Sequence, residues 1–176
     1  MTREEAEKEL IAMLEEAEDG PTYSMEEVDA YMRELLHPKN QIYLTGDTHG
    51  RFERIISFCE RQQVQPESSF IILGDVGLNY YGDRRDRRGK DALAQIPITF
   101  FCIHGNHEMR PSEELGYQVK EYHGGKVWVQ PEYPNLVFAI DGEIYDFFGH
   151  SCIVIGGAYS VDKYYRLARG YNWFED

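Results

Sequence analysis

The sequence predicts an α/β protein with a mainly parallel sheet, preceded by a helical appendage. Short, continuous apolar runs alternate with helical segments between residues 41 and 105, as in parallel sheets that are buried on both faces. From residue 126 the pattern becomes rich in strands. Before residue 40 the chain is acidic and helical in pattern.

The N-terminal region predicts two helices. Residues 2–18 read as an acidic amphipathic helix, and Ser24 with Glu27 forms a capping-box pattern for a second helix that runs to residue 36. We therefore place a boundary near residue 38, between a helical appendage (1–38) and the main domain (39–176). We expect the appendage to pack as a structural element. The alternative is that it binds a protein partner or a second copy of the chain.

The main domain predicts strands and helices in a regular order. The first part predicts strands at 41–46, 69–74 and 97–105, with helices at 51–63 and 89–95. The second part predicts strands at 126–130, 136–140, 143–148 and 152–159, with a hairpin turn at 148–151.

Charge narrows the classes of function. The chain has 31 acidic against 18 basic residues and a net charge of −13. Such a chain would be repelled by nucleic acid and by anionic membranes, so we expect neither broad nucleic-acid binding nor membrane binding. A small phosphorylated substrate is still compatible, because it responds mainly to the charges of its own site.

Cellular location is inferred from the N-terminus and the cysteines. The first ten residues are charged, unlike a signal peptide, and no apolar run reaches the roughly 20 residues of a membrane span. Cys59, Cys102 and Cys152 are odd in number and far apart, which favours buried free thiols. We therefore expect a cytoplasmic protein.

Polar side chains follow three predicted strands at the points where the strands end. Asp47 and His49 follow the first, Asp75 the second, and Asn106 the third. Because the carboxyl ends of parallel strands meet at one edge of a sheet, we expect these side chains to converge. Carboxylate, imidazole and amide donors suit Mn, Fe, Zn or Mg.

The donors can be divided between two ions. Asp47 and His49 can face one ion, a carboxylate such as Asp75 can bridge two, and Asn106 can offer its amide oxygen to the second. Two ions about 3.5–4 Å apart are a common arrangement for the hydrolysis of phosphate esters.

The three strand-end motifs, "GDTHG", "GDVG" and "GNHE", resemble those of the calcineurin-like metallophosphoesterases, most closely their bacterial and phage-type members. The later stretches "HGGKVW", "DGEIYDF" and "GGAYSVDKYYR" match the same pattern. The resemblance covers roughly residues 40–176. It implies a four-layer α/β sandwich and a metal-dependent phosphoesterase that hydrolyses phosphate mono- or diesters by a metal-bound hydroxide.

The resemblance also implies a role for each motif residue. Asp47, His49 and Asp75 would bind the first metal ion, and Asp75 and Asn106 the second. His107 would lie near the leaving group as a general acid or charge stabiliser. The substrate would be a small phosphorylated molecule or a phosphoprotein.

One part of the family pattern is missing. No GHxH motif follows, although this motif would supply further metal ligands. Either the chain is a truncated form of a longer protein, which we favour, or it is a natural short form with a crippled or one-metal site. The second metal site would then be incomplete. The alternative function is a non-catalytic or partly active binding or regulatory module.

The remaining histidines offer weaker candidates. His104 lies two residues before Asn106 and is a candidate to support the metal ligands without binding the metal itself. His123 is expected to hydrogen-bond locally. His150 is placed in the hairpin turn, and His37 in the linker.

Four further residues are candidates for substrate binding or for supporting the ligands. Glu108 and Arg110 flank the "GNHE" turn, and Glu108 would orient His107. Asp162 and Arg166 follow "GGAYS" and either order the pocket or begin a helix that Ser160 caps.

A basic cluster follows the second strand end. We expect the "DRRDRR" segment at 83–88 to form a solvated loop; the alternative is that its arginines bind a second phosphate or a nucleotide. Tyr80 and Tyr81 would pack under this loop or stack on a base.

Overall fold

The computed structural model describes residues 3–15, 23–36, 40–157 and 160–174. The chain divides into two compact units, Met1–Lys39 and Asn40–Asp176. Among the described residues, no helix combines the length and the apolar character that crossing a membrane requires.

The first unit consists of two helices, α1 (Arg3–Glu15) and α2 (Met25–Leu36). The predicted capping box is formed: the Ser24 amide donates to Glu27 Oε2 at 2.7 Å, and the Glu27 amide donates to Ser24 Oγ at 3.2 Å. The predicted end of the first helix and most of the predicted linker lie outside the described residues.

The second unit contains eight strands, three α-helices and one short 3₁₀ helix within its described part. In chain order these elements are β1 (Ile42–Gly46), α3 (Glu53–Gln62), β2 (Ser69–Leu73), α4 (Arg84–Ala94), β3 (Thr99–Ile103), η2 (Glu113–Leu115), β4 (Gln118–Tyr122), β5 (Gly125–Val129), β6 (Leu136–Ala139), β7 (Ile144–Phe147), β8 (His150–Ile153) and α5 (Lys163–Ala168).

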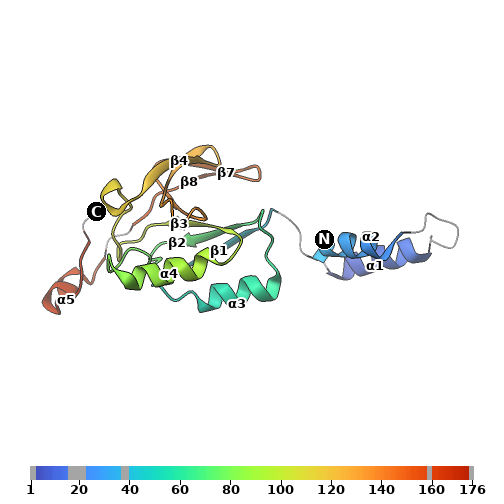
Figure 1. The fold of residues 1–176 in the computed structure, drawn as a ribbon, viewed down its shortest axis with the longest axis horizontal. Coiled ribbons are helices and arrows are strands. Elements are labelled where there is room, and N and C mark those ends of the chain that lie inside the picture. Colours follow the sequence, from blue (N-terminus) through green and yellow to red (C-terminus); the bar gives the residue numbers. More distant parts are fainter. Residues whose placement is uncertain (1–2, 16–22, 37–39, 158–159, 175–176) are drawn as a thin grey trace. The chain divides into compact units, whose positions relative to one another are not determined.

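Six strands form one sheet in the order β1-β2-β3-β6-β5-β4 (Figure 1). β1, β2, β3 and β6 are parallel neighbours, whereas β5 pairs antiparallel with both β6 and β4. The carboxyl ends of β1, β2 and β3 therefore meet at one edge, as the sequence predicts.

Two apolar cores lie on the two faces of this sheet. On one face, Phe70, Ile72 and Phe100 pack against residues of α3 and α4 such as Ile55 and Leu93. The other face lies under the β7–β8 hairpin (Figure 1). The predicted α/β fold of the metallophosphoesterase type is confirmed. The described residues form three of its layers: helices, central sheet and hairpin.

The hairpin is joined to the central sheet through Tyr145, which is fully buried. Its hydroxyl donates to the Lys126 carbonyl at 2.6 Å and accepts from the Ile140 amide at 2.9 Å. β8 itself is exposed along its length, and Cys152 with it, so the prediction that all three thiols are buried is wrong for this cysteine. The sequence missed this because "CIVI" is as apolar as a buried strand.

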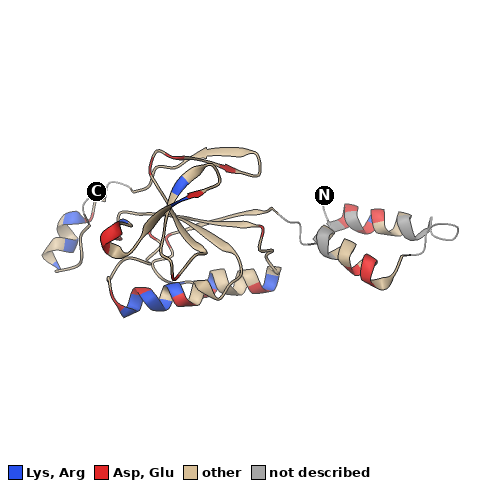
Figure 2. Cartoon of the chain, turned by 45° about the horizontal axis from the view of Figure 1, so that its top comes forward, with Lys and Arg blue, Asp and Glu red and all other residues tan. Residues whose placement is uncertain are grey.

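The basic segment at 83–88 is helical, which corrects the predicted loop. α4 begins at Arg84 rather than near residue 89, and its basic residues gather at its start (Figure 2). Asp83 caps the helix by accepting from the Arg85 amide at 2.8 Å. Asp86 is buried and accepts from the amides of Tyr81 and Gly82. These two carboxylates accept hydrogen bonds from backbone amides that have no partner within the helix, in the first turn and in the preceding loop. They therefore favour a helix that begins at Arg84.

Lys90 of α4 is buried at the centre of a polar cluster. Its Nζ donates to Asn79 Oδ1 at 3.0 Å, Tyr117 OH at 3.1 Å and Gln130 Oε1 at 2.8 Å. Burial lowers the pKa of Lys90 to about 8, although Asp86, Cys102 and Glu108 favour the charged form. The cluster ties α4 to the loop after β2 and to the end of β5.

Lys90 should make stability depend on pH above pH 8. Between pH 8 and about 10.5 the folded state releases this proton while the unfolded state keeps it, so the Lys90 contribution to the free energy of unfolding should rise with pH, by up to about 3 kcal/mol. The measurement is urea unfolding of wild type and Lys90→Met from pH 7 to 10.5. The difference between the two should rise with pH; a constant or falling difference contradicts the assignment. The cysteine thiols are present in both proteins, so their effect on the free energy of unfolding largely cancels in the difference between wild type and Lys90→Met.

Candidate metal centre

The loops that follow β1 and β2 continue side by side beyond the strands. The amide of His49 donates to the Asp75 carbonyl at 2.8 Å, and the amide of Gly50 donates to the Val76 carbonyl at 2.9 Å. Gly77 permits this approach, because a Cβ at residue 77 would overlap the backbone of Gly50. The sequence therefore delivers the first two strand-end motifs to one place.

Three candidate ligands have a left-handed backbone, which is uncommon outside glycine. The φ angles are 51° at Asp47, 46° at His49 and 45° at Asp75. Such conformations cost of order 1–3 kcal/mol and concentrate at functional sites. The chain accepts this cost at three of the four positions that the sequence predicts as ligands.

The carboxylate of Asp75 is closely surrounded at the sheet edge where β1, β2 and β3 end, and we call the space that it occupies its seat. Its side chain is 11% exposed, and Oδ1 accepts from the His107 amide at 3.0 Å. Gly105 forms the wall of the seat, because a Cβ there would overlap both Oδ1 and the backbone nitrogen of Asp75. The glycine of "GNHE" thus makes room for the carboxylate of "GDVG".

Two histidines approach the other carboxylate oxygen of Asp75. His107 Nδ1 lies 3.4 Å and His49 Nε2 lies 3.9 Å from Oδ2. One donor atom from each of His49, Asp75 and His107 can be chosen so that all three lie within 4.8 Å of one another. The sequence did not predict His107 in this group, because only its place beside Asn106 was visible.

A second group of residues also includes Asp75. A depression of about 260 Å³ is lined by Asp47, Asp75 and Asn106, among others. Asp75 therefore belongs both to this depression and to the group of His49, Asp75 and His107, which we call the histidine cluster. Asp47 is not a member of that cluster.

The residues fit a divalent metal ion by their chemistry. Carboxylate, imidazole and amide oxygen donors converge from three strand ends, and no thiolate is among them. His107 Nε2 is also buried without a hydrogen-bond partner, and Asp162 Oδ1 lies 3.6 Å from it. Such a set of polar groups is typical of a binding site rather than of a packed core.

Comparison with known families decides the identity. A family model described as calcineurin-like phosphoesterase matches residues 41–176. The chain belongs to this family. The family is metal-dependent, so the cluster at the strand-end edge is the candidate metal centre of a calcineurin-like phosphoesterase domain.

One solved structure is similar to part of the chain. It is a protein of unknown function from Aquifex aeolicus, 20% identical, and the match covers 51% of this chain and 59% of that one with a TM-score of 0.26. This match carries no conclusion about the phosphoesterase domain.

Glu108 has a different role from the predicted one. Its side chain is buried and accepts from the amides of Gly105 at 3.1 Å, Val76 at 3.0 Å and Gly77 at 2.9 Å. It therefore joins the second and third strand-end loops rather than orienting the His107 ring. Burial raises the pKa of Glu108, against the opposing effect of the three amides.

His104 and Arg110 form a polar group with Asp141, which the sequence did not single out. His104 is buried, and its Nε2 lies 2.9 Å from Asp141 Oδ2; Arg110 contacts both residues. Asp141 also accepts from the Gly156 amide at 2.7 Å. This group supports the loop beside the smaller depression.

Asp162 and Arg166 reach the candidate site from the C-terminal segment. Asp162 approaches His107, and Arg166 Nη2 donates to the Tyr80 hydroxyl at 3.0 Å. The predicted cap is wrong in detail, because Asp162 occupies the N-cap position of α5 and Ser160 bonds to Asp162. That bond is the leading cause of the lowered pKa of Asp162.

The remaining histidines lie away from the cluster or outside the described residues. His123 Nδ1 bonds to the Asp146 carbonyl at 2.7 Å, which confirms the predicted local hydrogen bond. His150 begins β8 and is exposed. His37 lies outside the described residues.

Proposed function

We propose that the chain hydrolyses phosphate mono- or diesters with two divalent metal ions that share Asp75. As the motif resemblance implies, Asp47 and His49 would hold one ion and Asn106 the other, although Asp47 lines the smaller depression with Asn106 rather than joining His49 and His107. The observation that carries this proposal is the position of Asp75, which belongs both to the histidine cluster and to the smaller depression.

When bound, divalent ions supply Lewis acidity toward the phosphoryl oxygens and lower the pKa of water. The chain's own contribution is to hold these donors before the substrate arrives. Asp75 is fixed by the His107 amide and the Gly105 wall, and Glu108 fixes the loops that carry both. This preorganisation favours an in-line attack on phosphorus.

His107 is proposed to act on the leaving oxygen. It lines a cavity of about 680 Å³ together with His49, Tyr80 and Arg166. Carboxylates lie near both ring nitrogens, Asp75 at 3.4 Å from Nδ1 and Asp162 at 3.6 Å from Nε2. A ring held between two carboxylates is suited to donating a proton or to stabilising developing charge.

The proposed function is tested by phosphoester hydrolysis with defined metal ions. Release of p-nitrophenolate from p-nitrophenyl phosphate and from bis(p-nitrophenyl) phosphate should require added Mn²⁺ and stop with EDTA. Mn²⁺, Fe²⁺, Zn²⁺ and Mg²⁺ are compared. If all four leave the protein inert toward both esters, the alternative of a non-catalytic binding module with this fold is favoured.

The His107→Gln variant should show whether His107 donates a proton to the leaving oxygen or binds a metal ion. As a proton donor, His107 should matter most for esters with poor leaving groups: hydrolysis of an alkyl phosphate should fall by about 10²–10³-fold, and that of p-nitrophenyl phosphate by less than about tenfold. Bound Mn²⁺ should be unchanged. His123→Gln, which lies away from the cluster, is the matched control.

The contrary outcome is also clear. If His107→Gln loses Mn²⁺ and slows both esters equally, His107 is a ligand of the histidine cluster, and its proposed role on the leaving oxygen is wrong.

A further inference from the structure

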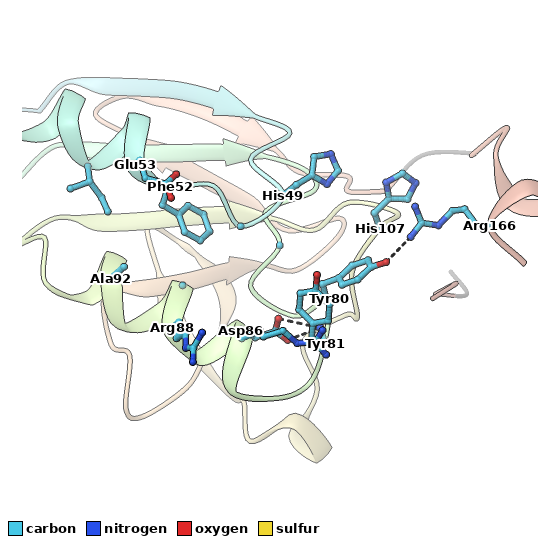
Figure 3. Close-up of a pocket in the computed structure, with 15 residues that line it drawn as sticks. His49, Phe52, Glu53, Tyr80, Tyr81, Asp86, Arg88, Ala92, His107 and Arg166 are labelled. Atoms are coloured by element: carbon cyan, nitrogen blue, oxygen red, sulfur yellow. Dashed lines mark hydrogen bonds between the residues drawn. The ribbon is translucent and has the colours of Figure 1, made fainter. Parts of the chain in front are cut away.

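Residues 160–174, which we call the strap, lie against the candidate metal centre. The strap contains α5 and brings Asp162 and Arg166 to the site. Arg166 lines the cavity of about 680 Å³ together with His107. Figure 3 shows Arg166 reaching from the C-terminal segment to the hydroxyl of Tyr80. The strap therefore forms part of the wall of this cavity.

Arg166 also closes the strap on itself. Its Nε and Nη2 both donate to the Asn172 carbonyl at 3.1 Å, so the chain after α5 turns back toward the helix. The Tyr171 amide donates to the Arg166 carbonyl at 2.9 Å. A segment that is bonded within itself in this way can move as one unit.

Tyr80, in the loop after β2, is the residue to which the strap binds. Arg166 Nη2 donates to the Tyr80 hydroxyl at 3.0 Å, and Asn172 Nδ2 donates to the Tyr80 carbonyl at 3.2 Å. The Phe174 ring meets the Tyr80 ring edge-on, with the ring centroids 5.6 Å apart. We call these three contacts the latch.

The loop that carries Tyr80 is fixed independently of the strap. The neighbouring Asn79 is buried; its carbonyl accepts from the Met109 amide at 2.9 Å, and its Oδ1 accepts from Lys90 Nζ at 3.0 Å. By contrast, α5 has no buried residue. Segments with few buried contacts open at the lowest cost, so the strap is the side of the latch that can move.

One nitrogen of His107 is closed to solvent beside the strap. Nδ1 faces the histidine cluster, 3.4 Å from Asp75 Oδ2, so Nε2 is the nitrogen left for a leaving oxygen. Nε2 is buried and has no hydrogen-bond partner among the described residues. Asp162 Oδ1, which accepts from the Ser160 hydroxyl, lies 3.6 Å away, too far for a hydrogen bond.

This arrangement opposes substrate and is also unfavourable in itself. Asp162 places a carboxylate beside the nitrogen that an anionic ester must approach, and like charges repel. A buried polar atom without a partner costs free energy, and release of the strap removes that cost for His107 Nε2. The docked strap is therefore poised to open.

We propose that the strap is autoinhibitory: docked on Tyr80, it withholds His107 Nε2 from the leaving oxygen, and hydrolysis requires the latch to open. The inference rests on the proposed function, which gives His107 its role. The balance between docked and released strap then sets the fraction of the protein that is competent.

The test weakens the latch without changing any residue that lines the cavity. The release variant combines Asn172→Ala with Phe174→Ala, which removes two of the three latch contacts. The matched control combines Tyr164→Ala with Leu167→Ala, two exposed side chains of α5. Tyr80→Phe, which removes only the hydroxyl from the latch, is a second and milder release variant.

The first readout is the modification of histidines by diethyl pyrocarbonate, followed in EDTA by peptide mass spectrometry. In the release variant the rate at His107 should rise about tenfold, the factor expected from losing a hydrogen bond and an aromatic contact, and the rate at His49 should change by less than about twofold. His49 is the internal reference because its side chain is already 42% exposed. Unfolding would raise both rates. Tyr80→Phe should give a smaller rise at His107, and the control should match wild type.

The second readout is hydrolysis of an alkyl phosphate with added Mn²⁺, which should rise in the release variant by up to about tenfold. An unchanged rate at His107 in both latch variants would overturn the inference. Hydrolysis that is unchanged or slower although His107 has become reactive would also overturn it, because the strap would then not inhibit. A release variant that exposes His107 but, like wild type, hydrolyses no ester supports the cover over His107 and contradicts the proposed function.

Discussion

Replacing Asp75 with asparagine should lower metal-dependent phosphoester hydrolysis by at least about 10³-fold, because both proposed metal positions lose the carboxylate they share. The substitution keeps the shape of the side chain. An amide oxygen can still accept from the His107 amide, so the seat beside Gly105 should stay intact. The effect is therefore expected on Mn²⁺ binding and kcat rather than on the free energy of unfolding.

The measurements for Asp75→Asn are Mn²⁺ content after dialysis and initial rates with p-nitrophenyl phosphate. Asp146→Asn is the matched control, since Asp146 is an exposed carboxylate on β7 that accepts from the Gly149 amide at 2.9 Å. Full activity of Asp75→Asn at saturating Mn²⁺ would contradict the shared role of Asp75.

Replacing Gly105 with alanine should be nearly as damaging, although residue 105 carries no ligand atom. The added Cβ overlaps Oδ1 and the backbone nitrogen of Asp75, so the carboxylate must leave its seat or the third strand-end loop must move. We expect Mn²⁺ binding and hydrolysis to fall by about 10²-fold or more, with about 1–3 kcal/mol lost from the free energy of unfolding.

The control for Gly105→Ala is Gly142→Ala. Gly142 has a φ of 82° and open space around its Cβ position, whereas Gly105 does not have a positive φ. The control therefore gives the cost of an added methyl group, backbone strain included, at a position away from the cluster. A Gly105→Ala protein that binds Mn²⁺ like wild type would show that the seat of Asp75 is wider than the structure indicates.

The strand-end residues were predictable because one local rule carries them. A parallel strand ends at one edge of its sheet, so Asp47, His49, Asp75 and Asn106 could be expected near one another from order alone. The sequence could not reveal which of these residues lie together in one group of ligands and which lie in another. His49 meets His107 on one side of Asp75, and this depends on the left-handed turns after β1 and β2.

The misplaced features depend on contacts between distant residues. Glu108 looked like a partner for His107, yet it binds amides from residues 76, 77 and 105, which adjoin only after β2 and β3 pair. Asp141 lies 37 residues from His104 along the chain, and no local pattern links them. The start of α4 was missed because four arginines between 84 and 88 resemble a solvated loop until the capping by Asp83 is seen.

The binding of Mn²⁺ by the whole chain tests the central claim most directly. Equilibrium dialysis counts the ions per chain, and low-temperature electron paramagnetic resonance shows whether two ions are coupled. The shared position of Asp75 predicts two Mn²⁺ per chain with the signal of a coupled pair, and the loss of that signal in Asp75→Asn. A single ion at saturation, or two uncoupled ions, would contradict the claim that Asp75 joins two metal positions.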